Sequence, residues 1–217
     1  SGADNLAIGH DAAKLLTAGG NNTIVGQHAF DAAADDESDN IVLGLGAMGA
    51  AAQGGTASST NREVKQNIAI GSGALMGGTL ASTNHLESCI AIGHNALDGT
   101  GDANAVDNIA IGGSAMGGSW AGGCVKNIAI GTFALDAAMN DANSNIAIGS
   151  GSSGALTTGD ANIAIGAYFD ATYKGAMETN TVGSYSIAIG SGALQTANEN
   201  DNDGSVAIGH GALRVQA

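Results

Sequence analysis

The chain has 217 residues, of which 36 are glycine and none is proline, with 3% aromatic residues and a formal net charge of −14. Twenty acidic side chains against six lysines and arginines would repel nucleic-acid phosphates and anionic membrane surfaces, which argues against both as partners. The sequence has no continuous apolar stretch of about 18 residues, the length that a transmembrane helix requires. Membrane insertion is therefore not expected.

A five-residue motif, written Asn-Ile-Ala-Ile-Gly at 67–71, recurs eleven times in nearly unchanged form. Short repeats of this kind are typical of solenoids, in which each copy forms one rung stacked on the last. The copies extend over 1–217 as a single repeat domain. The sequence therefore predicts an all-β fold, a parallel β-solenoid of about eleven rungs. The glycine of each copy stands at Gly9, Gly26, Gly44, Gly71, Gly93, Gly112, Gly131, Gly149, Gly166, Gly190 and Gly209.

Isoleucine and alanine alternate within the motif, and a period of two is typical of a β-strand. Because β-branched residues are favoured in strands, we expect the isoleucine pairs to face inward as the structural core. The intervening alanines are then expected to face outward and to offer a flat contact surface to another copy of the chain. The expected core residues are Ile68, Ile70, Ile90, Ile92, Ile109, Ile111, Ile128, Ile130, Ile146, Ile148, Ile163, Ile165, Ile187 and Ile189.

Two further signals recur around many of the strands. An Ala-Leu pair such as Ala74-Leu75 follows the motif glycine by three residues, and its leucine is expected to return to the core. In 149–156 this pair is delayed, which suggests a local bulge. Stacked asparagines could form an amide ladder, and simple turn formation is the alternative. Asparagine begins eight of the motifs, at Asn5, Asn22, Asn40, Asn67, Asn108, Asn127, Asn145 and Asn162.

The two cysteines, Cys89 and Cys124, belong to rungs that are two apart. Stacking would separate their Cα atoms by more than the roughly 7 Å that a disulfide allows. Two separate thiols are expected.

The strings NIAIGSGAL, NIAIGTFAL and SVAIGHGAL, at 67–75, 127–135 and 205–213, resemble the head repeats of YadA-like trimeric autotransporter adhesins. They are also similar to related phage tail-fibre repeats of the form N-x-A-I-G-x-x-A-L. The resemblance extends over all eleven copies. It implies a left-handed parallel β-roll, a side-by-side homotrimer and a role in attachment.

Candidate ligand-binding residues are aromatic, because aromatic rings stack on sugar faces and anchor protein interfaces. The alternative is that these side chains pack their loop onto the solenoid. They are Tyr168, Phe169, Tyr173 and Tyr185, in or beside a long excursion over 168–185, and Trp120 between two glycines.

The acidic run 199–204 partly resembles a calcium loop, with Glu199, Asp201 and Asp203 as candidate metal ligands. His210 stands where such a loop needs its closing glutamate, and solvated turns are the alternative. No cofactor is expected apart from calcium at this run. Histidine also follows the motif glycine at positions 10, 94 and 210. In a trimer, the three copies of each histidine could form a ring that binds a metal or an anion.

No set of side chains typical of catalysis stands out, so we do not expect an enzyme. The leading interpretation is a non-enzymatic fibrous attachment protein, an adhesin or a receptor-binding segment of a tail fibre. It would lie outside the cell, on a cell or virion surface, and bind a cell-surface glycan or protein through its loops. A structural subunit stacking end to end into an extracellular filament is the alternative. A polysaccharide-cleaving solenoid is a third class of function. It would need carboxylates clustered on adjacent rungs, and the sequence shows no convincing set.

Overall fold

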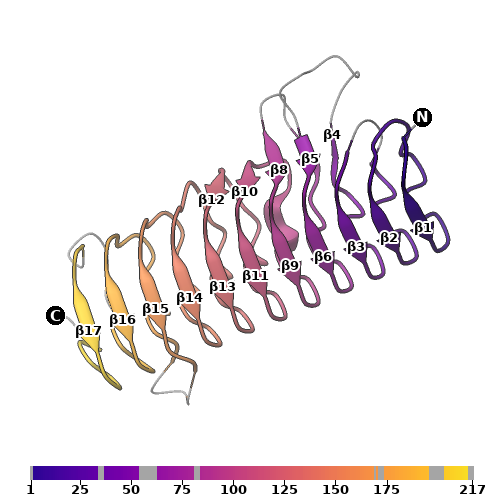
Figure 1. Cartoon of the computed structure of the whole chain (residues 1–217). Coiled ribbons are helices and arrows are strands. Elements are labelled where there is room, and N and C mark those ends of the chain that lie inside the picture. Colours follow the sequence, from indigo (N-terminus) through magenta and orange to yellow (C-terminus); the bar gives the residue numbers. More distant parts are fainter. Residues whose placement is uncertain are drawn as a thin grey trace.

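The computed structural model describes residues 2–33, 37–53, 63–80, 84–168, 170, 174–195 and 203–214. Over these ranges the chain is an all-β solenoid in which each turn adds one parallel strand to the same sheet (Figure 1). With strands about 4.8 Å apart, this main sheet runs for about 50 Å. Its strands, in order, are β1 (Leu6–Ile8), β2 (Thr23–Val25), β3 (Ile41–Leu43), β6 (Ile68–Ile70), β9 (Ile90–Ile92), β11 (Ile109–Ile111), β13 (Ile128–Ile130), β14 (Ile146–Ile148), β15 (Ile163–Ile165), β16 (Ile187–Ile189) and β17 (Val206–Ile208).

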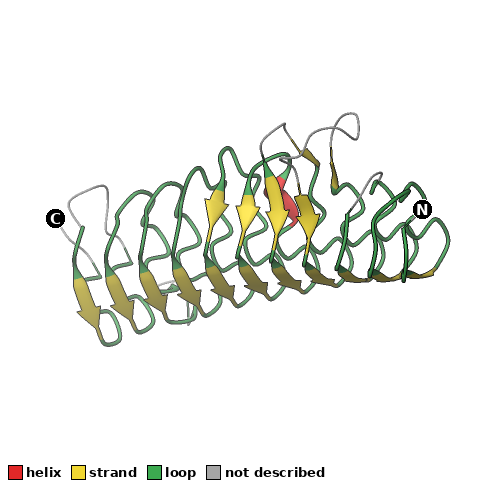
Figure 2. Ribbon diagram, turned by 45° about the horizontal axis from the view of Figure 1, so that its top comes forward, coloured by secondary structure: helices red, strands yellow, loops and turns green. Residues whose placement is uncertain are grey.

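In the middle of the rod, a second wall of strands, each two or three residues long, precedes the main sheet (Figure 2). Its four parallel strands are β5 (Glu63–Lys65), β8 (His85–Glu87), β10 (Ala105–Val106) and β12 (Cys124–Val125). A residue with positive φ, such as Gln66 at 59° or Lys126 at 61°, forms the corner between the two walls. A two-stranded sheet, β4 (Ala52–Gln53) with β7 (Thr79–Leu80), and one 3-10 turn, η1 (Asp98–Thr100), complete the regular structure of the described residues.

Of the two alternatives for the repeated asparagines, the amide ladder is the one that the structure shows. Asn127 shows the repeating contact: its Oδ1 accepts hydrogen bonds from the backbone N of Asn145 at 2.9 Å and from the Asn145 Nδ2 at 3.2 Å. The same pattern joins Asn22 to Asn40 and Asn145 to Asn162. Because these side chains are buried, the ladder pairs polar groups at the corner of each rung that would otherwise be unpaired.

The expected orientation of the main strands is wrong: the alanines face the core and the isoleucines face outward. Ala69, Ala110 and Ala147 are fully buried, whereas Ile130 is 37% exposed. Successive strand residues point to opposite faces, so burying the alanine of a three-residue strand turns both isoleucines out. The inward central residue is alanine in nine of the eleven strands, and the larger Ile24 and Val42 fill the same buried position in β2 and β3. The side chains wrongly assigned to the core are Ile68, Ile70, Ile90, Ile92, Ile109, Ile111, Ile128, Ile130, Ile146, Ile148, Ile163, Ile165, Ile187 and Ile189, all half-buried or exposed.

Large core side chains come from the opposite wall, as the Ala-Leu pairs predicted. Leu75, Leu97, Leu135 and Leu194 are fully buried, and Phe30, Met48, Met116 and Met177 hold the equivalent positions. All eight adopt left-handed backbone with φ between 48° and 54°. Bulky residues rarely adopt this conformation, so the stacked turns must hold it. The Leu75 N, for example, donates to the Ala96 O of the next rung at 2.8 Å.

The bulge expected in 149–156 is absent. Strand β14 pairs with β13 and β15 without a break in register. Ser152 and Ser153 are buried where other rungs have Ala-Leu, and Ser153 has the same left-handed φ, 49°. The Ser152 Oγ donates to the Ala164 O at 2.9 Å. The sequence difference is therefore a substitution of serine for the core pair, which leaves the turn unchanged.

Both cysteines are buried and free, as predicted. Cys89 occupies a place in the asparagine ladder, where its backbone N donates to the Asn67 Oδ1 at 3.0 Å. Burial raises the pKa of the Cys89 thiol to about 12 and that of Cys124 to about 11. Among the described residues no helix has the length and apolar character needed to cross a membrane.

Candidate functional site

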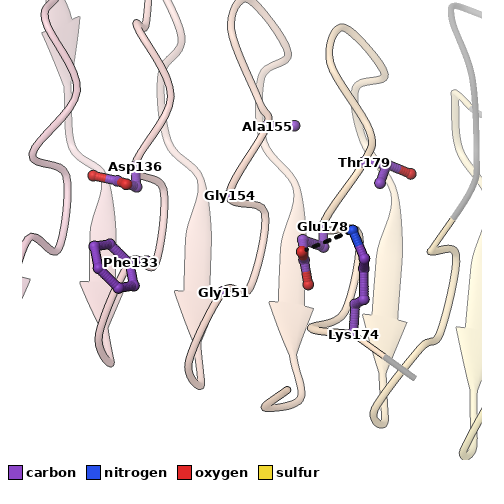
Figure 3. A pocket seen from close by; sticks show the side chains of 8 residues that line it. All are labelled: Phe133, Asp136, Gly151, Gly154, Ala155, Lys174, Glu178 and Thr179. Atoms are coloured by element: carbon purple, nitrogen blue, oxygen red, sulfur yellow. Dashed lines mark ion pairs between the residues drawn. The ribbon is translucent and has the colours of Figure 1, made fainter. Parts of the chain in front are cut away.

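A groove of about 300 Å³ crosses three rungs on one side of the solenoid (Figure 3). Phe133, from the rung of β13, forms one wall and is 52% exposed. Lys174 and Glu178 form the opposite wall. The remaining lining residues are Asp136, Gly151, Gly154, Ala155 and Thr179.

The groove exists because the middle rung has almost no side chains there. Gly151 lies between Phe133 and the next rung, and the backbone N of Gly151 donates to the Thr132 O at 3.0 Å. Gly154 lies in the same way between Asp136 and Glu178 (Figure 3). Neighbouring rungs are only about 4.8 Å apart, so a larger residue at either glycine would fill this space.

Charged groups line the groove beside the aromatic ring. The Lys174 Nζ lies 3.4 Å from a Glu178 carboxylate oxygen, and the other oxygen of Glu178 accepts from the Gly175 N at 2.8 Å. Burial, and secondarily the charge of Asp98, raise the pKa of Asp136. Asp98 and Asp136 are two rungs apart, on either side of Gly117. An aromatic face flanked by polar groups is suited to a saccharide or a polar peptide segment.

The outer face of the main sheet is the second candidate surface. It carries two columns of aliphatic side chains, one before and one after each buried central residue. Thr23 is the single polar side chain among the outward positions of these eleven strands. Exposure is largest at the two ends, reaching 55% at Ile8 and 67% at Ile208. An apolar surface this continuous is unusual on a monomeric soluble protein.

Three predicted ligand-binding residues lie in the described part of the chain, and they form no common patch. Trp120 is only 9% exposed and belongs to the core, so it does not present a binding face. Tyr168 and Tyr185 are exposed, but Tyr168 follows the end of β15 whereas Tyr185 precedes the start of β16. Because the strands are parallel, these two positions lie at opposite ends of the strands. Phe169 and Tyr173 fall outside the described residues.

The predicted calcium ligands are described only in part. Glu199 and Asp201 fall outside the described residues, whereas Asp203 is exposed. The Asp203 Oδ1 accepts a hydrogen bond from the Ser184 N at 2.7 Å, a contact that stabilises the turn between rungs. Calcium binding at this loop stays a prediction.

Comparisons of the chain with protein-family models, with curated proteins and with solved structures found no match. The resemblance of the repeats to adhesin heads and tail fibres therefore stays a prediction from the sequence. The fold itself rests on the structure.

Sequence reasoning missed the groove, although a signal was present. Phe133 is the third letter after Ile130 in NIAIGTFAL, where the next rung has Gly151. A large aromatic residue stacked beside a glycine in the next repeat predicts a step in the surface. The step becomes visible only when the repeats are aligned by their strand glycine and compared one position at a time.

Proposed function

We propose that this chain is the rod of a non-enzymatic fibrous attachment protein. Copies of the rod pack side by side through the outer aliphatic face, and the groove at Phe133 binds a cell-surface glycan. The observation that carries this proposal is the double aliphatic column along the main sheet. It replaces the alanine face as the expected contact surface, because the alanines are buried inside the single chain.

Side-by-side packing follows from the energetics of this face. Burying the exposed part of each isoleucine contributes on the order of 1 kcal/mol. This is less than a fully exposed isoleucine would contribute, because part of each side chain is already buried in the single chain. The columns repeat this gain along about 50 Å of rod. Three copies around one axis is the arrangement that the resemblance to adhesin heads implies, and we propose a homotrimer on an extracellular or virion surface.

A charge in the middle of the aliphatic face is expected to break the assembly. Ile130→Glu would bury a carboxylate among aliphatic side chains, which is costly without a partner. We expect light scattering after size exclusion to give a trimer for the unmodified chain and a monomer for this variant.

Ala138→Glu is the matched control, because Ala138 is exposed on the same rung outside the strand. It should assemble normally, and circular dichroism should show both variants folded. An unmodified chain that is monomeric would refute the proposed packing. Long filaments in electron micrographs would instead favour the end-to-end structural subunit.

Loss of the aromatic wall is expected to weaken ligand binding at the groove. Phe133→Ala should weaken binding to any glycan found on an array by about tenfold, as expected when one stacking aromatic contact is lost. Tyr185→Ala is the control, because it removes an exposed aromatic ring that precedes β16 and does not line the groove. Binding that depends on Tyr185 and not on Phe133 would place the ligand elsewhere. Shortened oligosaccharides after incubation would contradict a non-enzymatic role.

A further inference from the structure

We propose that the first two rungs form a binding site for a late first-row divalent metal ion such as Zn²⁺. Its ligands are His10 and Asp11 from the first rung and His28 from the second, with Asp31 beside them. Ligand atoms of His10, Asp11 and His28 all lie within 4.8 Å of one another. This site is separate from the groove and from the outer aliphatic face.

The backbone brings these side chains together. The His28 N donates to the His10 O at 2.9 Å, which fixes the two rungs in register after their strand glycines. Asp11 and His28 both adopt left-handed backbone, with φ of 57° and 53°. Asp and His are among the residues that tolerate this conformation best. The rings of His10 and His28 meet edge to face with centroids 5.5 Å apart.

The distances are close to those that a tetrahedral metal with three protein ligands requires. The Asp11 Oδ2 lies 3.6 Å from the His10 Nδ1 and 3.8 Å from the His28 Nδ1, and the Asp31 Oδ2 lies 3.3 Å from the His28 Nδ1. Zinc ligands at about 2.0–2.2 Å in a tetrahedron are about 3.3–3.6 Å from each other. Small side-chain movements would therefore complete the site. Imidazole with carboxylate is a donor set that suits zinc, copper or nickel better than calcium.

Lys14 is the competitor at this site. Its Nζ lies 3.1 Å from the Asp11 Oδ2, the carboxylate oxygen that also faces both histidines. Because the Lys14 side chain is 56% exposed, it can move into solvent when a divalent ion replaces it.

A second cluster, Glu63, His85 and Glu87, shows the same kind of grouping but is less suited to a metal. The Lys65 Nζ contacts both glutamates, and its side chain is less exposed than that of Lys14, at 33%. Lys65 therefore pairs with both carboxylates and competes with a metal ion for them. His85 provides the only imidazole of that cluster.

Titration of the full chain with zinc chloride, in competition with a chromogenic chelator, tests the proposal. We expect one high-affinity zinc per chain and a loss of affinity of about tenfold or more in His28→Gln. Lys14→Met should bind zinc more tightly than the unmodified chain, because it removes the competing charge. Cobalt substitution should give the intense visible absorption of tetrahedral coordination.

His94→Gln is the matched control, since His94 follows its strand glycine as His10 does but is not part of either metal-ligand cluster. Its zinc affinity should equal that of the unmodified chain. The proposal is overturned if His28→Gln binds zinc as tightly as the unmodified chain, or if the high-affinity zinc is lost in His85→Gln instead. A chain that takes up no zinc at stoichiometric concentration would overturn it as well.

Discussion

Gly93→Ala is expected to lower the free energy of unfolding by about 3–5 kcal/mol. Gly93 has a φ of 137°, a conformation that residues with a Cβ rarely adopt. An added Cβ would also lie 2.5 Å from the Gly112 O, which is backbone of the next rung and cannot turn aside. The alanine would therefore have to push two rungs apart. Chemical denaturation followed by far-ultraviolet circular dichroism measures the loss.

Gly46→Ala is the control for this prediction. Gly46 also has positive φ, 60°, but an added Cβ there would meet nothing within 4 Å, and the equivalent residues His28 and Phe133 adopt similar φ values with a side chain. Alanine at this position should cost only about 1 kcal/mol, from backbone strain alone. Equal losses in the two variants would show that close stacking of the strand glycines contributes nothing.

Asn127→Ala is expected to destabilise the fold by about 2–4 kcal/mol. The side chain bonds in both directions along the ladder. Its Oδ1 accepts from the Asn145 N and Nδ2, and its Nδ2 donates to the Ala142 O at 2.9 Å and to the Asn108 Oδ1 at 3.2 Å. Alanine would leave these buried partners without their bonds. Thermal and chemical unfolding should both report the loss.

The chain itself suggests the graded variant for this second test. Ser186 stands in the ladder after Asn162, and its Oγ accepts from the Ser205 N at 3.3 Å. Asn127→Ser should therefore retain one of the bonds and lose less stability than alanine. Asn140→Ala, at an exposed position on the same rung, should change stability little. If Asn127→Ala is as stable as that control, the ladder is not a source of stability.

The repeat architecture could be predicted because its determinants are local. The strand glycine, the alternating triplet and the leading asparagine each imply one conformation, and stacking copies in register follows from their order. The sidedness of the strand could not be predicted in the same way. An Ile-Ala-Ile strand is compatible with either orientation, and the choice depends on the side chains that share the core with it, such as Leu75 from the opposite wall, which the strand motif does not show.

The candidate sites depend on contacts between rungs, which the spacing of one motif does not show. His10 follows its strand glycine by one residue, whereas His28 follows by two, so a search for repeated positions separates them. Phe133 and Gly151 hold equivalent positions, but the groove also needs the Lys174–Glu178 pair, which an insertion after Gly166 displaces in the sequence. Superimposing the rungs in three dimensions shows both the histidine cluster and the groove.

The in-register pairing of nearly identical strands has an architectural consequence. Where β11 and β13 present the same three residues to their neighbours, the upper surface of one turn is interchangeable with that of the next. A duplication or excision of a whole turn would rejoin matching surfaces and change the reach of the molecule by about 4.8 Å. Evolution can therefore lengthen or shorten the rod in steps of one turn while its cross-section stays the same.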